Sequence, residues 1–191
     1  FVDFVAENFT RDQLEILLKD LARRVKKSRA KLFNGDMGLA SRRKIQGDLA
    51  RNIESICTKI LLRFEDISLA LSLSSFSYLI DQLGGDCKVS FSKTMLERVN
   101  KSRHGLKNNK VINHVFNGAK ALHDSLDPLS TAVSDRDIIF NLVTQFVSKV
   151  VFDEENIDAE LRFLTSCRSA FINADGALIK IVDRAITIVQ H

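Results

Sequence analysis

The sequence is poor in the residues that make turns. Its 191 residues include one Pro and eight Gly, and Trp is absent. All-β sandwiches and barrels need frequent turns, many of them made by Gly and Pro. These counts therefore exclude a typical all-β fold and favour long helices. Low-complexity disorder and collagen-like structure are also excluded, because apolar residues make up 45% of the chain and charged residues 27%.

Cysteine is scarce and scattered, and long apolar runs are missing. Cys57, Cys87 and Cys167 are odd in number and form no CxxC pair, so neither a disulfide framework nor a cysteine zinc site is expected. The longest uncharged run, residues 67–80, has 14 residues, and a membrane span needs about 18 or more. No signal peptide is visible. The cysteine pattern favours a reducing compartment, either cytosol or nucleus. The chain begins without Met and is already apolar at helical spacing, which suggests a fragment of a longer polypeptide.

Apolar residues recur at helical spacing along most of the chain. Thr10 and Gln13 have the spacing of a capping box, and the apolar stripe behind them predicts a helix over residues 11–32. Ser41 is predicted to cap the next helix, in which Gly47 costs about 1 kcal/mol relative to Ala. Its predicted buried stripe consists of Ile45, Leu49, Ile53, Ile56 and Ile60.

Further apolar patterns predict the remaining helices. Residues 66–83 are predicted to form one central helix, ended by Gly84 and Gly85, and Ser92 or Thr94 is expected to cap a shorter helix after it. The last helices are expected at residues 111–126, 134–150, 153–171 and 175–189, with Asp127-Pro128 as a break and Ser134, Asp153 and Asp175 at helix starts.

The spacing of these elements predicts the architecture. About seven to nine helices recur every 20–25 residues, so a pair takes about 40–47, which is typical of HEAT-like repeats. The predicted fold is all-α, with antiparallel helix pairs stacked as an α-solenoid fragment and residues 1–191 forming a single segment of it. A compact helical bundle is the alternative.

No pattern in the sequence indicates catalysis, a metal or a cofactor. His123, Asp124 and Ser125 are the residue types of a hydrolase triad, but consecutive helical residues point about 100° apart, and a triad is defined by side-chain geometry. No two of the four His residues have the spacing of a zinc-binding helix. We therefore expect a protein that is not an enzyme.

Charge is distributed unevenly along the chain. Residues 1–64 contain 14 Lys and Arg against 8 Asp and Glu, whereas residues 134–191 contain 6 against 9. The basic residues of the first part that we predict to contact a partner or an anionic surface are Arg23, Arg24, Lys26, Lys27, Arg29, Lys31, Arg42, Arg43 and Lys44. A solvated helix face, an acidic protein and an anionic membrane are all compatible with them. Nucleic acid is disfavoured as a partner, because no aromatic residues for base stacking lie between the charges.

Five short segments, taken in order, resemble one protein family. They are Phe1-Val2 to Thr10, Phe64-Glu65-Asp66-Ile67-Ser68, His123-Asp124-Ser125-Leu126, Phe146 to Phe152 with Lys149-Val150 inside it, and Arg168-Ser169-Ala170-Phe171-Ile172-Asn173. Together they resemble the large α-solenoid subunit of Retriever, the endosomal recycling complex related to retromer. The segments at residues 33–44 and 100–109 look longer than is usual in that family.

The resemblance implies a scaffold that works on endosomes. In that family the solenoid holds an arrestin-like subunit, its C-terminal part grips a phosphoesterase-fold subunit used for binding, and the assembly associates with the COMMD/coiled-coil complex. The implied role is non-catalytic support of protein transport from endosome to plasma membrane, in the cytoplasm and peripheral on endosomes. The motif residues are implied to be structural, with Phe64, Phe146, Phe152 and Phe171 in the core and Asp66 and Asn173 capping or bridging helices. The alternative is a helical module that binds nucleic acid or an acidic partner through residues 19–51.

Overall fold

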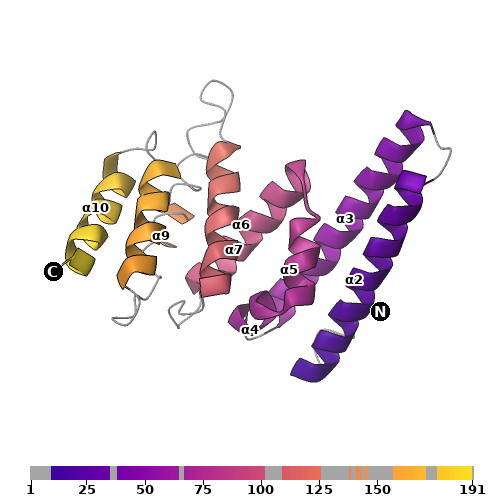
Figure 1. Ribbon diagram of the computed structural model, residues 1–191, viewed down its shortest axis with the longest axis horizontal. Coiled ribbons are helices and arrows are strands. Elements are labelled where there is room, and N and C mark those ends of the chain that lie inside the picture. The colour runs from indigo at the N-terminus through magenta and orange to yellow at the C-terminus, as the bar shows by residue number, and fades with distance from the viewer. Residues whose placement is uncertain are drawn as a thin grey trace. The chain divides into compact units, whose positions relative to one another are not determined.

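The regular structure is entirely α-helical wherever the chain is described. The computed structural model describes residues 10–34, 38–64, 67–101, 109–125, 138, 141–142, 145, 157–170 and 176–190. Its eight helices within these residues are α2 (Arg11–Asn34), α3 (Leu39–Arg63), α4 (Ile67–Ser72), α5 (Ser74–Asp81), α6 (Gly85–Lys101), α7 (Asn109–Asp124), α9 (Ile157–Ala170) and α10 (Gly176–Gln190) (Figure 1). The predicted all-α class is confirmed, and the packing of helices against one another is consistent with an α-solenoid fragment.

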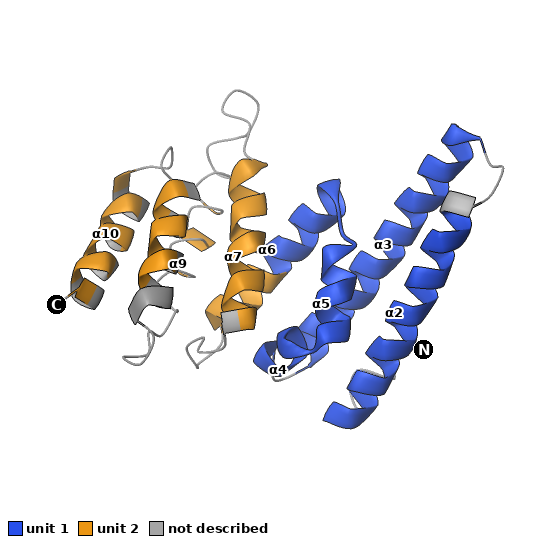
Figure 2. Cartoon of the chain, viewed as in Figure 1, with its two compact units in different colours: residues 1–94 blue, residues 95–191 orange. Residues whose placement is uncertain are grey.

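The chain divides into two compact units, residues 1–94 and residues 95–191 (Figure 2). In the first unit, α2 packs against α3 and α5, and α3 also packs against α4 and α5. In the second unit, α9 packs against α10. The single solenoid segment over residues 1–191 stays a prediction.

The start of α2 follows the predicted capping box. The Thr10 backbone N–H donates to Gln13 Oε1 at 3.0 Å, and the Gln13 N–H donates to Thr10 Oγ1 at 3.4 Å. The helix ends at Asn34, two residues beyond the predicted end. Its buried face contains Leu14, Leu18 and Val25, as expected from their helical spacing.

The predicted start of α3 is wrong, and its predicted stripe is buried only at Ile53 and Ile60. The helix begins at Leu39 with Gly38 as its N-cap, and no side chain caps it, so Ser41 lies inside the first turn. Ile45 is 41% exposed and Ile56 is only half-buried. The buried face consists of Ile53, Cys57, Ile60 and Leu61. Apolar spacing predicted the helix correctly, but the neighbouring helices decide which part of it is covered.

Gly47 has no packing role in α3, which makes a stabilising substitution possible. A Cβ atom at this position would meet only Arg51 Nη1, at 3.9 Å, which is an ordinary contact. Since Gly inside a helix costs about 1 kcal/mol relative to Ala, Gly47→Ala should raise the free energy of unfolding by about that amount. Urea unfolding followed by circular dichroism measures the change. An unchanged or lower stability would contradict the open surroundings of Gly47.

The predicted helix at residues 66–83 is in fact two helices. Leu73 leaves helical conformation, with ψ of 123°, and separates α4 from α5 as the N-cap of α5. Near the break, Ser72 Oγ donates to the Leu69 carbonyl at 2.7 Å. Such local bonds from Ser side chains to the backbone compete with the hydrogen bonds of a continuous helix. The burial of this segment was predicted correctly, since Leu71, Phe76 and Leu79 are all nearly inaccessible.

The caps predicted for α6 are also wrong. The helix begins at Gly85, whose φ of +52° suits Gly. Ser92 and Thr94 therefore lie inside the helix, where Ser92 is 2% exposed and Thr94 Oγ1 donates to the Ser90 carbonyl at 3.4 Å. Gly84 and Gly85 separate two helices, as predicted, but Gly85 belongs to the second one.

The later helices agree with the sequence where they are described. α7 buries Val111, Val115 and Ala119 on one face, and α9 and α10 bury Leu164 and Val182. Phe64 is half-buried at the end of α3, where its N–H donates to the Ile60 carbonyl at 2.8 Å. The other predicted motif residues and boundaries lie outside the described residues. These are Asp66, Asp127, Pro128, Ser134, Phe146, Phe152, Asp153, Phe171, Asn173 and Asp175.

Candidate interaction surface

The predicted basic residues gather toward one end of the α2–α3 pair. The two helices have 24 and 25 residues, or roughly 36 Å each, and lie side by side (Figure 1). Residues 35–37 connect them in the sequence, so the end of α2 and the start of α3 share one end of the pair. We call residues 27–34 of α2 and 38–45 of α3 the hairpin tip.

The hairpin tip contributes little to the core. On α2, every residue from 26 to 31 is exposed, and Leu32 is the one buried residue among those of the tip whose side chains are described. On α3, no residue from 39 to 52 is buried, and the first buried residue is Ile53. The tip is thus a surface made mainly of solvated side chains on two regular helices.

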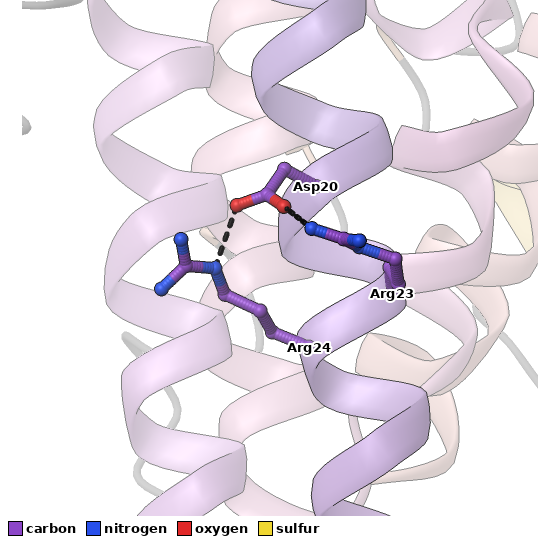
Figure 3. Close-up of polar contacts among 3 residues, drawn as sticks. All are labelled: Asp20, Arg23 and Arg24. Carbon is purple, nitrogen blue, oxygen red and sulfur yellow. Dashed lines mark hydrogen bonds and ion pairs between the residues drawn. The ribbon is translucent and has the colours of Figure 1, made fainter.

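Two of the predicted contact residues share one carboxylate. Arg23 Nη2 and Arg24 Nε each donate to a different oxygen of Asp20, both at 2.6 Å (Figure 3). These bonds, first from Arg23 and then from Arg24, lower the pKa of Asp20 below its ordinary value. Asp20 is therefore ionised at neutral pH, and it balances one of the two positive charges of these arginines.

Two other predicted contact residues hold α2 against α5. The Lys26 ammonium lies over the Tyr78 ring, 4.8 Å from its centroid, which is within range of a cation–π interaction. Arg29 Nη2 donates to the Gln82 carbonyl at 3.5 Å, a long bond. Both side chains therefore face a neighbouring helix as well as solvent, and they have a structural role that the sequence analysis did not assign.

Four cations of the hairpin tip are exposed and not neutralised by any described residue. They are Lys27, Lys31, Arg43 and Lys44, and we call them the tip cations. Within the described ranges, no ion pair or hydrogen bond involves their side chains. Arg42 differs from them because it is half-buried and its Nε atom is inaccessible to solvent. The nine predicted residues therefore divide into paired, packed and solvated groups.

The charge around the tip is strongly one-sided. Residues 21–47 contain nine Lys and Arg and a single acidic residue, Asp36. An apolar side chain accompanies these charges, because Leu39, the first residue of α3, is 67% exposed. This combination of solvated cations and an exposed Leu can bind an anionic surface that also offers apolar contact.

The residues that could suggest catalysis do not form a catalytic arrangement. Ser125 Oγ donates to the Leu122 carbonyl at 2.6 Å, not to the His123 imidazole. Asp124 pairs with Lys120, which lowers the pKa of Asp124, and lies 3.7 Å from His123 Nδ1. The bond from nucleophile to base that a triad requires is therefore not formed by these three residues.

A shallow depression lies between α7 and α9. It has a volume of about 510 Å³ and is lined by Phe116, Lys120, Thr165, Ser166 and Ser169. Ser166 Oγ already donates to the Arg162 carbonyl at 2.8 Å, and Lys120 pairs with Asp124. No cluster of three or more metal-binding side chains occurs among the residues described here. The described lining of the depression therefore contains no convergent titratable groups of the kind that mark active sites.

The sequence analysis did not identify the roles of Lys26 and Arg29, which contact α5 and the residue after it. It also did not identify the exposure of Leu39. Lys26 follows the buried Val25 directly, and Arg29 lies four residues after it, so the helical period places both beside the buried face of α2. That signal was present in the sequence. The exposure of Leu39 could not be inferred from it, because apolar spacing does not show where a core ends.

The comparisons with known proteins converge on one family. The model of the family described as the VPS35L C-terminal domain matches residues 1–190. The chain is 26% identical over 182 residues to a "VPS35 endosomal protein sorting factor-like" protein of Dictyostelium discoideum. It is 22% identical over 184 residues to proteins with the corresponding name in Mus musculus and in Danio rerio. Each match covers 95% of this chain but only 17% of the relative.

Proposed function

Because the chain belongs to the VPS35L C-terminal domain family, we propose that it is a non-catalytic scaffold segment of a Retriever-like endosomal cargo-recycling complex. Its resemblance to the large subunit of Retriever, first indicated by five short segments, is confirmed by the family match. The relatives are named as endosomal protein sorting factors. The proposed role extends that name to this chain and specifies transport from endosome to plasma membrane.

The structure supports a scaffold more than an enzyme. Helix pairs that pack on one another present long side-chain surfaces suited to holding other proteins. The two concave or polar features considered above, the α7–α9 depression and the His123 segment, lack a nucleophile bonded to a base. The single observation that carries the proposal is the family match over residues 1–190.

The family also indicates which partners to test. We propose that this C-terminal segment contributes to binding a phosphoesterase-fold subunit, and that the arrestin-like subunit and the COMMD/coiled-coil complex belong to the same assembly. We propose a cytoplasmic location, peripheral on endosomes. No helix within the described residues is long and apolar enough to cross a membrane, which is compatible with peripheral attachment.

The direct test is binding of this chain to the purified phosphoesterase-fold subunit of its own organism. Co-elution on gel filtration, with a calorimetric heat of binding, is the expected result. Affinity purification of the tagged protein from cells, read by mass spectrometry, should recover the arrestin-like subunit and COMMD proteins as well. Recovery of nucleic-acid-binding proteins in their place would overturn the scaffold proposal and favour a nucleic-acid module.

A further inference from the structure

We propose that the hairpin tip docks on an anionic phospholipid surface. The tip cations would lie among the lipid headgroups, and Leu39 at the start of α3 would enter the interfacial region of the bilayer. The proposal rests on the charge, exposure and packing of α2 and α3 alone.

The first argument is the position of the cations on α2. Lys27 is two residues and Lys31 six residues beyond the buried Val25, so they lie about 200° and 240° around the helix from it. Both side chains therefore point away from the face that packs against α3 and α5. Neither needs to leave an internal contact in order to reach an external anion.

The second argument is the lack of internal neutralisation. Nearer the start of α2, Lys19 pairs with Glu15 at 2.7 Å, and Asp20 forms ion pairs with both Arg23 and Arg24. Beyond Asp20 the described part of the tip contains no carboxylate at all. Lys27 and Lys31 are like charges four residues apart on one helix, a spacing at which they repel, and an anionic lipid surface relieves that repulsion. Each Lys or Arg near such a surface raises the affinity about fivefold.

The third argument is Leu39, which distinguishes a membrane from nucleic acid. It is 67% exposed and lies one helical turn before Arg43, so an apolar group and a cation share one face of α3. Interfacial helices combine these two features, with apolar side chains in the acyl boundary and Lys or Arg at the headgroups. A phosphate backbone offers the cations a partner but gives Leu39 no apolar contact, and the aromatic platform for base stacking is missing.

The test is co-sedimentation of the full chain with lipid vesicles. The chain should bind vesicles of phosphatidylcholine mixed with phosphatidylserine and bind phosphatidylcholine alone much more weakly. Replacing the four tip cations with Gln should weaken binding at least a hundredfold. The matched control replaces Lys93, Lys101, Lys180 and Arg184, which are exposed cations elsewhere, with Gln. Both variants change the net charge from +4 to zero, so an equal loss in the control would overturn the proposal.

A second pair of variants tests the apolar contact. Leu39→Ser should weaken vesicle binding about tenfold. Ile16→Ser should leave it unchanged, although Ile16 is also 67% exposed, because it lies near the other end of α2. If Leu39→Ser has no effect, or if an acidic peptide or duplex DNA binds the tip cations more tightly than the vesicles do, the membrane proposal is overturned.

Circular dichroism and thermal unfolding of each variant check that the fold is kept, which is expected because all the replaced side chains are exposed. Binding of the phosphoesterase-fold subunit should be unaffected by the tip variants. Failure of vesicle binding and failure of subunit binding are therefore separate results.

Discussion

Replacing Phe76 with Ala should lower the free energy of unfolding by about 3–5 kcal/mol. Phe76 on α5 is fully buried, and its ring meets Phe91 of α6 edge to face, with centroids 6.4 Å apart and ring planes at 80°. The substitution removes the largest buried side chain of α5 and leaves a cavity that the surrounding helices can fill only in part. Chemical unfolding of the wild type and the variant measures the difference.

A double-mutant cycle separates the ring contact from the lost burial. Phe76→Ala and Phe91→Ala together should cost less than the sum of the single changes, with a coupling energy of about 0.5–1.5 kcal/mol. Ile16→Ala is the control, because a side chain that is 67% exposed should change stability by about 0.5 kcal/mol or less. A cost below about 1 kcal/mol for Phe76→Ala would mean that α5 and α6 do not pack as described.

The same core explains how the hairpin tip can be solvated and still ordered. α5 holds the middle of α2 through buried apolar contacts, and Lys26 and Arg29 reach Tyr78 and Gln82 at its edge. Beyond these contacts α2 continues for several residues as a regular helix beside α3. The tip is therefore an extension of a packed hairpin, so the helix positions that carry its cations are set before any ligand binds. A surface fixed in this way loses less conformational entropy on docking than a flexible basic segment.

The helices that could be predicted are those whose caps and apolar spacing lie within their own sequence. The capping pair Thr10 and Gln13, followed by a regular apolar stripe, was enough to place α2 within two residues of its observed end. α7 was predicted for the same reason, from apolar residues at steps of three and four. In both helices the sequence-local preference and the tertiary burial agree, which is the condition for a reliable prediction.

The errors occur where burial depends on distant segments. In α3 the apolar pattern extends over residues 39–52, none of which is buried, so Ile45 looks like a core residue and is 41% exposed. In residues 66–83 the continuous apolar content predicted one helix, but the helix is broken at Leu73. The bond from the Ser72 side chain to the backbone favours this break. For the candidate surface, the pairing of Asp20 with Arg23 and Arg24 follows from their spacing. The contact from Arg29 to Gln82 spans 53 positions, and no local pattern reveals it.

Cys57 should make the fold less stable as the pH rises above about 9. Cys57 on α3 is fully buried, and burial, with a smaller contribution from Glu54, raises the pKa of its thiol from 9.0 to about 12. Below pH 9 the thiol is neutral in both the folded and the unfolded chain. Between these two pKa values only the unfolded chain ionises, so the free energy of unfolding should fall by about 1.4 kcal/mol per pH unit.

The measurement is urea unfolding of the wild type and of Cys57→Ala over a pH range from about 8 to about 11. Lys and Tyr side chains also titrate in this range, but they are present in both proteins, so their effect cancels in the difference. Cys57→Ala should be the less stable protein near pH 8, because it leaves a small cavity, and should lose less stability as the pH rises. A stability difference that stays constant with pH would contradict the raised pKa. Thiol labelling gives an independent check, since the half-buried Cys87 should react well before Cys57, whose thiolate forms only when the fold opens.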